Sequence, residues 1–290
     1  MPTVTSSDGT TLTYTTIGTG PSLIIIHGTF SQADSHTELA QSLSSFLTVI
    51  IYNRRSLSLG KDGPPNADYT MKVEVADLHA ILTATNADYI LGISSGAIIC
   101  LETLRYHSSL VQKCALWEPI AILDGSVDMT FVSRYNTEIS AGKTEAALVT
   151  AMLGTHLGPA ILRCFPRSFL EWMAKRGIHS QERKKKNEDE ITLKDLAPTI
   201  GYDFKILEEC KDDVERWKDI ETEVLLMSGH KSPDYIKKGT GAVEKVLINV
   251  KRIDFKAFSH GAVLNKEYGG KPGPLTEELK KFFVGRLSKE

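Results

Sequence analysis

The sequence predicts an α/β protein built on a doubly wound, mostly parallel β-sheet, with a helical segment inserted into it. Short apolar runs suited to buried strands alternate with segments of helical spacing up to about residue 117 and again from residue 223. Between these parts the alternation lapses into helical stretches without a convincing strand. We therefore expect a core of residues 1–122 and 220–290 and a helical cap, or lid, of residues 123–219.

Length and charge narrow the class of protein. With 290 residues, 41% of them hydrophobic, the chain can bury one large core. A net charge of -2 gives no general attraction to nucleic acid or to a membrane surface, and no apolar run is long enough to cross a bilayer. No secretory signal is visible, and four widely spaced cysteines favour reduced thiols. We expect a cytoplasmic protein with a small-molecule substrate; the sequence makes no prediction of its oligomeric state.

The first half of the chain supplies most of the predicted strands. Two strands are expected within residues 4–17, around a turn at Asp8-Gly9. The apolar run at residues 23–26 suits a strand buried on both faces. Further elements follow in order: a helix over 35–46, a strand over 48–52, a helix over 70–84, a strand ending at Ile90-Leu91, a helix over 97–106 and a strand over 114–117.

The second half begins with helices. Helical stretches are predicted within the insertion at residues 131–139, 145–153, 160–175 and 206–217. The alternation then resumes with a strand over 223–227, a helix near 235–246, a strand over 250–255 and a closing helix over 275–287.

The organising stretch is residues 92–96, Gly-Ile-Ser-Ser-Gly, between a predicted strand and a predicted helix. A strand that turns directly into a helix around Gly-x-Ser-x-Gly holds the central serine in a strained conformation, with its hydroxyl at the carboxyl edge of the sheet. The helix N-terminus offers N–H groups and a positive dipole end to a developing oxyanion. Taken alone, the motif could be only a turn; in this context it predicts Ser94 as a nucleophile.

A second motif, His27-Gly28-Thr29-Phe30, directly follows a buried strand. The backbone N–H of Thr29 or Phe30 could form one half of an oxyanion hole, with the N–H of Ser95 as the other half. His27 itself is expected to fix this loop through hydrogen bonds.

The general base is expected late in the chain, after the last strand. His260 meets this condition, and His230 is a weaker competitor. The remaining histidines outside the His27 motif fall within or beside predicted helices, where a packed or surface role is expected: His36, His79, His107, His156 and His179.

With these motifs, the chain resembles the α/β-hydrolase superfamily over about residues 12–283. The resemblance includes His27-Gly28-Thr29, residues 92–96, the late Ser259-His260-Gly261 and the position of the helical insertion. Residues 52–58, Tyr-Asn-Arg-Arg-Ser-Leu-Ser, resemble the family's Tyr-Asp-Arg-Arg-Gly-Phe-Ser type loop, but Asn53 replaces Asp and Ser56 replaces Gly.

The third member of the expected triad departs from the family pattern. The resemblance implies an Asp shortly after the strand that follows the cap, but Ser232 stands there. We favour Glu118, because an acid at the end of the 114–117 strand would share a sheet edge with Ser94 and His260. Haloalkane dehalogenases and some fungal lactonases are similar in placing their acid there. Asp234, expected to cap the next helix, is the alternative, and Asp124 is a distant third.

These residues predict a serine hydrolase. Ser94 would attack an acyl carbon while His260 takes its proton, and Glu118 would hold the imidazole. The amides of Thr29 and Ser95 would receive the oxyanion.

Large apolar residues predict a largely apolar pocket for a small to medium ester, lactone or thioester. Phe30, Trp117 and Trp172 are the candidate substrate-binding residues. Two other classes stay open: an enzyme for a non-hydrolytic natural-product step, such as cyclisation or carbon–carbon cleavage, and a catalytically weak ligand-binding or receptor protein. No metal-ligand spacing, P-loop or dinucleotide turn appears, so no cofactor is expected.

Overall fold

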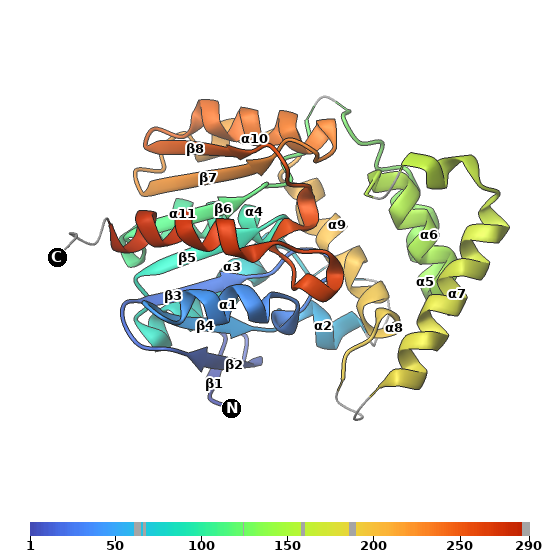
Figure 1. Ribbon diagram of the computed structural model, residues 1–290, viewed down its shortest axis with the longest axis horizontal. Coiled ribbons are helices and arrows are strands. Elements are labelled where there is room, and N and C mark those ends of the chain that lie inside the picture. The colour runs from blue at the N-terminus through green and yellow to red at the C-terminus, as the bar shows by residue number, and fades with distance from the viewer. Residues whose placement is uncertain (61–64, 66–67, 124, 158–159, 186–189, 286–290) are drawn as a thin grey trace.

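The computed structural model describes residues 1–60, 65, 68–123, 125–157, 160–185 and 190–285. Within these residues one eight-stranded sheet has helices on both faces, and a group of helices stands beside its carboxyl edge (Figure 1). The predicted fold class, α/β with a doubly wound and mostly parallel sheet, is confirmed.

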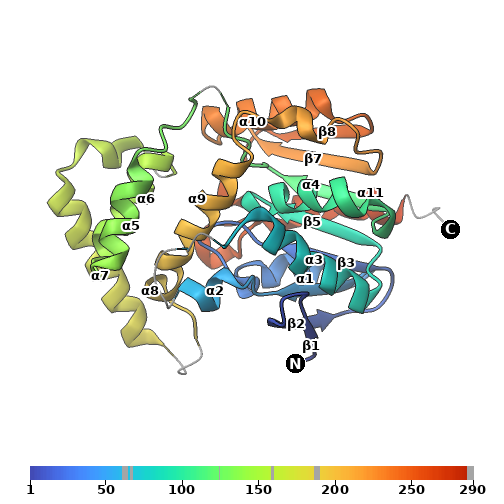
Figure 2. The same cartoon turned by 180° about the vertical axis from the view of Figure 1, so that it is seen from behind.

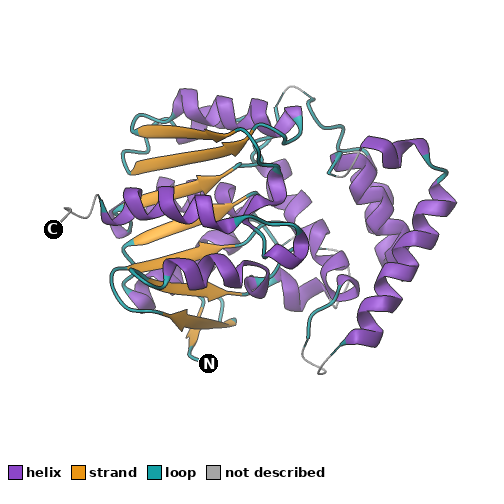
Figure 3. Ribbon diagram, viewed as in Figure 1, coloured by secondary structure: helices purple, strands orange, loops and turns teal. Residues whose placement is uncertain are grey.

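The strand order is β1-β2-β4-β3-β5-β6-β7-β8, with antiparallel pairing of β1 with β2 and of β2 with β4, and parallel pairing elsewhere. The central β3 and β5 are apolar almost throughout because helices cover both of their faces. Figure 3 shows the parallel strands pointing toward the separate group of helices. The strands are β1 (Thr3–Thr5), β2 (Thr11–Ile17), β3 (Ser22–Ile26), β4 (Thr48–Tyr52), β5 (Tyr89–Ile93), β6 (Lys113–Trp117), β7 (Glu223–Gly229) and β8 (Val250–Phe255).

Two hydrophobic cores lie on opposite faces of the sheet. One is formed with α3, α4 and α10, and the other with α1 and α11. The helices are α1 (Thr37–Leu43), α2 (Ser56–Leu59), α3 (Met71–Thr85), α4 (Ser95–His107), α5 (Phe131–Ser140), α6 (Thr144–Thr155), α7 (Arg167–Lys184), α8 (Leu193–Leu196), α9 (Ile200–Glu209), α10 (Asp234–Val246) and α11 (Pro272–Val284).

The insertion between β6 and β7 carries α5 to α9 and has a small core of its own. Helix α9 packs in two of these cores. Ile200 and Phe204 lie in the small core of the insertion, whereas Tyr202 and Ile206 lie in the main core, which the sheet forms with α3, α4 and α10. Figure 2 shows α9 standing between the sheet and α5 to α7. The division of the chain at residues 123 and 219 stays a prediction.

Two predicted helices of the insertion differ from the structure. The stretch at 160–175 is divided into a 3-10 turn, Ala160–Cys164, and α7, because Pro166 has no N–H to continue a helix. The stretch at 206–217 is also wrong as one helix: α9 ends at Glu209 and a separate 3-10 turn follows at Val214–Trp217. Across the described parts of the chain, no helix combines the length and apolar character needed to span a membrane.

Candidate active site

Ser94 lies at the sharp turn between β5 and α4. Its backbone has φ 59° and ψ -119°, a region that residues other than glycine rarely occupy. Its N–H donates to the carbonyl oxygen of Trp117 at 2.9 Å, which anchors the turn to the neighbouring strand β6. The side chain is nearly buried but lines a cavity at the carboxyl edge of the sheet.

Two glycines make room for this turn. A Cβ atom on Gly28 would lie 2.7 Å from the Cβ of Ser94, and one on Gly96 would lie 2.4 Å from the carbonyl oxygen of Ile26. Both contacts are shorter than non-bonded atoms tolerate, so any larger residue would displace the serine or separate α4 from β3. Steric crowding therefore explains why both sequence motifs have glycine at these positions.

His260 follows β8 and opens a short 3-10 turn, His260–Val263. Its Nε2 lies 3.0 Å from the hydroxyl oxygen of Ser94, and its Nδ1 lies 2.6 Å from a carboxylate oxygen of Glu118. Because Nδ1 faces a carboxylate, it carries the proton, and Nε2 accepts from the serine hydroxyl. Trp117 donates its indole N–H to the carbonyl oxygen of His260 at 2.9 Å and so helps to hold this turn.

Glu118 directly follows β6 and is fully buried, with a positive φ of 45°. Its second oxygen accepts from the N–H of Gly229 at 2.7 Å and from the hydroxyl of Ser228 at 3.2 Å. Burial raises the pKa of Glu118, but hydrogen bonds from His260 and Gly229 outweigh it and bring the pKa below the ordinary value of 4.5. The carboxylate is thus ionised at neutral pH beside the imidazole.

The other acid candidates lie elsewhere. Asp234 is the first residue of α10 and not its predicted cap, since Pro233 holds the N-cap position. Its side chain is 87% exposed and forms an ion pair with Lys237 at 2.7 Å. Asp124 lies outside the described residues. The geometry brings together Ser94, His260 and Glu118, in the order that a nucleophile, a base and an orienting acid require. Their catalytic roles stay a prediction.

The predicted oxyanion-hole residues lie on two neighbouring segments. Ser95 is the first residue of α4, so its N–H has no acceptor within the helix. Thr29 lies in the loop after β3, and its hydroxyl donates to the hydroxyl oxygen of Ser95 at 3.1 Å. The two segments therefore meet beside the nucleophile turn.

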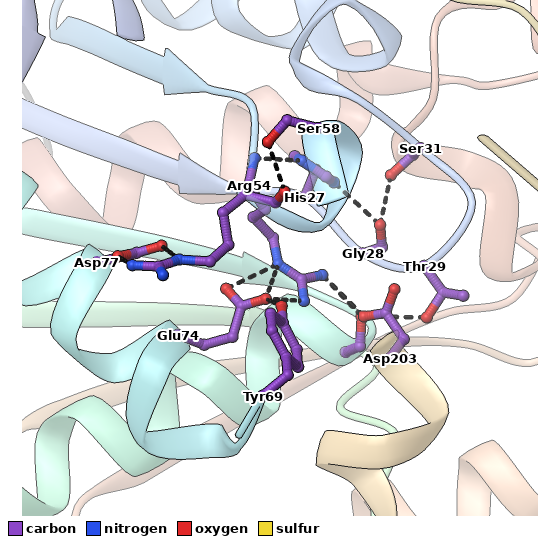
Figure 4. Close-up of polar contacts among 12 residues, drawn as sticks. His27, Gly28, Thr29, Ser31, Arg54, Ser58, Tyr69, Glu74, Asp77 and Asp203 are labelled. Atoms are coloured by element: carbon purple, nitrogen blue, oxygen red, sulfur yellow. Dashed lines mark hydrogen bonds and ion pairs between the residues drawn. The ribbon is translucent and has the colours of Figure 1, made fainter. Parts of the chain in front are cut away.

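His27 secures the loop after β3 that carries Thr29. Its Nδ1 donates to the carbonyl oxygen of Gly28 at 3.0 Å, and its Nε2 accepts from the backbone N–H of Arg54 at 3.2 Å (Figure 4). Burial lowers the pKa of His27 to about 3, so the ring is neutral and can hold both bonds. The predicted role of this histidine, fixing the loop, is confirmed.

A buried polar cluster under the site was not anticipated from the sequence. Arg54 forms hydrogen bonds from Nε to both carboxylate oxygens of Glu74, each at 3.1 Å, and from Nη1 to Asp203 at 2.8 Å. Tyr69 also contacts Glu74 (Figure 4). Asp203 accepts from the hydroxyl of Ser95 at 2.6 Å. Only the unusual Arg54-Arg55 loop signalled this cluster; Asp203 lies in a helix that showed no motif.

The cavity beside Ser94 has a volume of about 920 Å³. Its walls include the apolar side chains of Phe30, Ile93 and Leu264, and the insertion contributes Leu157. Charged and titratable groups also line it, namely Arg163, Lys231, Lys238, Asp234, His36, His156 and His260.

The three predicted substrate-binding aromatics are placed differently. Phe30 lines the cavity, whereas Trp117 is buried behind it on β6. Trp172 is 50% exposed on α7, where it stacks on Phe169, and it is not among the described cavity residues. No group of three or more potential metal ligands from His, Cys, Asp and Glu occurs in the described part of the chain.

The fold and this constellation are those of a hydrolase scaffold, and comparison with known proteins gives the family. The chain matches the model of the Alpha/beta hydrolase family over residues 23–254 and belongs to that family.

Individual relatives of low sequence identity or partial coverage agree with this family assignment. The uncharacterized hydrolase YraK of Bacillus subtilis (strain 168) is 31% identical over 116 residues, which span 39% of this chain and 43% of that relative. An alpha/beta hydrolase from Sphaerobacter thermophilus DSM 20745 is similar in structure, with a TM-score of 0.73 and 23% identity over 97% of this chain and 100% of that one. An enol-lactonase from Burkholderia xenovorans LB400 has a TM-score of 0.67 and 16% identity, over 98% and 100% of the two chains. At such identities the two solved structures show the shared fold alone.

Proposed function

We propose that this protein is a serine hydrolase that cleaves a small to medium ester, lactone or thioester through an acyl-enzyme on Ser94. The observation that carries the proposal is the continuous hydrogen-bonded chain from Ser94 through His260 to Glu118, at the wall of a cavity of about 920 Å³. Family membership supports hydrolysis, and the ester or lactone specificity is our inference from the site.

In the first half-reaction the Ser94 oxygen bonds to the acyl carbon while its proton moves to Nε2 of His260. The carbonyl oxygen becomes an oxyanion, which the N–H groups of Thr29 and Ser95 stabilise. The imidazolium, held by the buried carboxylate of Glu118, then donates the proton to the departing alkoxide or thiolate. In the second half-reaction a water molecule is the nucleophile. His260 removes a proton from the water, the water oxygen bonds to the acyl carbon, and His260 returns the proton to the Ser94 oxygen as that oxygen leaves.

The cavity wall points to substrates that carry a negative group. Arg163, Lys231 and Lys238 are cationic, whereas Asp234, the one carboxylate among the described cavity residues, forms an ion pair with Lys237. An anionic end of the substrate would be attracted to this wall while the scissile carbonyl sits at Ser94. Because these cations are exposed, the attraction is modest and sensitive to salt.

The test combines covalent labelling with turnover. A fluorophosphonate probe should label the wild-type protein but not Ser94→Ala, and a panel of esters, lactones and thioesters should show turnover that the variant loses. Ser133→Ala, which changes an exposed serine of α5, is the matched control and should behave as wild type. Wild-type protein that neither reacts with the probe nor hydrolyses the panel would favour a ligand-binding role, and full activity of Ser94→Ala would refute the acyl-enzyme.

A further inference from the structure

Asp203 connects the insertion to both residues whose amides are proposed to receive the oxyanion. One oxygen of this α9 carboxylate accepts from the hydroxyl of Ser95 at 2.6 Å and from Nη1 of Arg54 at 2.8 Å. The Ser95 oxygen in turn accepts from the Thr29 hydroxyl at 3.1 Å. Asp203 is 1% exposed and Ser95 is fully buried, so bulk water has little access to these hydrogen bonds.

Neutralising Arg54 does not require this carboxylate. Glu74 already contacts the guanidinium through Nε and Nη2 and is itself fully buried. Desolvation makes a second buried carboxylate unfavourable unless its hydrogen bonds recover that free energy. Burial accordingly raises the pKa of Asp203, against the opposing effect of Arg54. The bond that Glu74 does not duplicate is the one to Ser95.

The residue that Asp203 holds lies next to the nucleophile. Ser95 opens α4, and its hydroxyl is the meeting point of the α4 start, the Thr29 loop and α9. Oxyanion stabilisation depends steeply on the placement of its N–H donors, so a shift of either segment by a fraction of an ångström reduces it.

We propose that Asp203 is a positioning residue, which acts through Ser95 and Thr29 to fix the spacing of the two oxyanion-hole amides. This inference rests on the proposed function of the site. The positioning role also makes turnover depend on how the insertion packs against the sheet. Helix α9, which carries Asp203, packs through Ile200 and Phe204 in the insertion core and through Ile206 in the main core.

Two substitutions separate positioning from mere filling of space. In Asp203→Ala the Ser95 hydroxyl and Arg54 lose a shared acceptor, and we expect kcat to fall by about 10- to 100-fold while KM changes by less than about threefold. In Asp203→Asn the amide oxygen can still accept both hydrogen bonds, so kcat should stay within about fivefold of wild type. Measurements are made at a temperature where melting curves show every variant fully folded.

Glu138→Ala is the matched control. Glu138 is a carboxylate of α5 within the insertion, and its bonds go to Arg134, Arg167 and Thr150, all of them residues of the insertion. Its loss should lower the melting temperature but leave kcat unchanged. Equal losses of kcat in Glu138→Ala and Asp203→Ala would overturn the proposal, because a general loosening of the insertion would then explain both.

Two further readouts report on the oxyanion hole itself. An alkyl boronic acid forms a tetrahedral adduct with a serine nucleophile, so its inhibition constant should rise in Asp203→Ala by the same factor by which kcat/KM falls. In a double-mutant cycle, adding Asp203→Ala to Ser95→Ala should cost little more than Ser95→Ala alone, because both remove one connection.

The outcomes distinguish this inference from the proposed function. Wild-type protein that hydrolyses esters, combined with unchanged kcat and boronate affinity in folded Asp203→Ala, overturns only the role of Asp203. Additive effects in the double-mutant cycle overturn the route through Ser95. Wild-type protein that reacts with neither fluorophosphonate nor ester removes the proposed function and the positioning role together.

Discussion

The carboxylate of Glu118 lies 2.6 Å from Nδ1 of His260, although 142 positions separate the two residues in the chain. The contact exists because β6, β7 and β8 are neighbours in the sheet, so their carboxyl ends meet at one edge. The N–H of Gly229, at the end of β7, fixes the other carboxylate oxygen. The carboxylate that meets His260 therefore directly follows β6, the strand before the insertion, as the sequence analysis favoured.

Glu118→Gln should lower kcat by about 10³-fold or more, because an amide neither stabilises the imidazolium nor selects the correct tautomer. The measurement is steady-state turnover of the best ester from the panel, with circular dichroism to verify the fold. Asp234→Asn is the control and should stay within about twofold of wild type, since its exposed carboxylate pairs with Lys237. A loss in Asp234→Asn as large as that in Glu118→Gln would reverse the assignment of the acid.

Ser232→Asp should restore part of the activity that Glu118→Ala loses. Ser232 is buried and shares the cavity wall with Ser94 and His260, so a carboxylate there is on the correct side of the sheet to approach the imidazole. We expect a gain of about tenfold in kcat over Glu118→Ala alone. Ser232→Asn in the same background is the uncharged control; if it restores activity equally, charge is not the cause.

Stability should fall on mild acidification because two buried histidines stay neutral in the folded protein. Burial lowers the pKa of His27 to about 3 and of His36 to about 4, from an ordinary value of 6.5. Between the ordinary and the lowered pKa the unfolded chain binds the proton and the folded chain does not. Each histidine therefore contributes stability that is present above pH 6.5 and is lost as the pH falls, by about 1.4 kcal/mol per pH unit.

Urea unfolding at about pH 5 and about pH 8 measures this effect. His36→Gln should reduce the slope of the unfolding free energy against pH by the amount that corresponds to the uptake of about one proton, because the group that gains this proton on unfolding is absent. His179→Gln removes an exposed histidine of α7 and should leave the slope as in wild type. An unchanged slope in His36→Gln would show that its burial does not govern the acid response.

Substrate charge should matter in proportion to the cations of the cavity wall. We expect kcat/KM for an ester with a terminal carboxylate to exceed that for its neutral methyl ester by about 3- to 10-fold at low salt, and less at high salt. The double variant Lys231→Gln, Lys238→Gln should remove most of this preference while leaving turnover of the neutral ester within about twofold. An equal loss for both substrates would assign the lysines to stability of the wall instead.

Local patterns were sufficient for the fold class and for the choice of Ser94 and His260, and they favoured Glu118 while leaving Asp234 as an alternative. Alternating apolar runs predict the parallel sheet because buried strands and helices have different periodicities. Gly-x-Ser-x-Gly and His27-Gly28 predict a nucleophile turn because their glycines meet steric demands within a few residues, which the contacts at Gly28 and Gly96 bear out. The bounds of two helices within the insertion were predicted wrongly. Pro166 divides the helix predicted at 160–175, and α9 ends at Glu209, within the helix predicted at 206–217.

Only the tertiary structure decided which carboxylate meets His260 and what lies beneath Ser95. Glu118 and Asp234 both follow strands of the same sheet edge, and the difference between a buried and an exposed side chain arises from the packing of β6 against β7. Asp203 carries no motif, because its role depends on an α9 that returns from the insertion to pack beside α4. The sequence alone determined which local turns can form, because the residues of a turn are neighbours in the chain. Contacts between residues far apart in the chain depend on how all the helices and strands pack, so only the tertiary structure shows them.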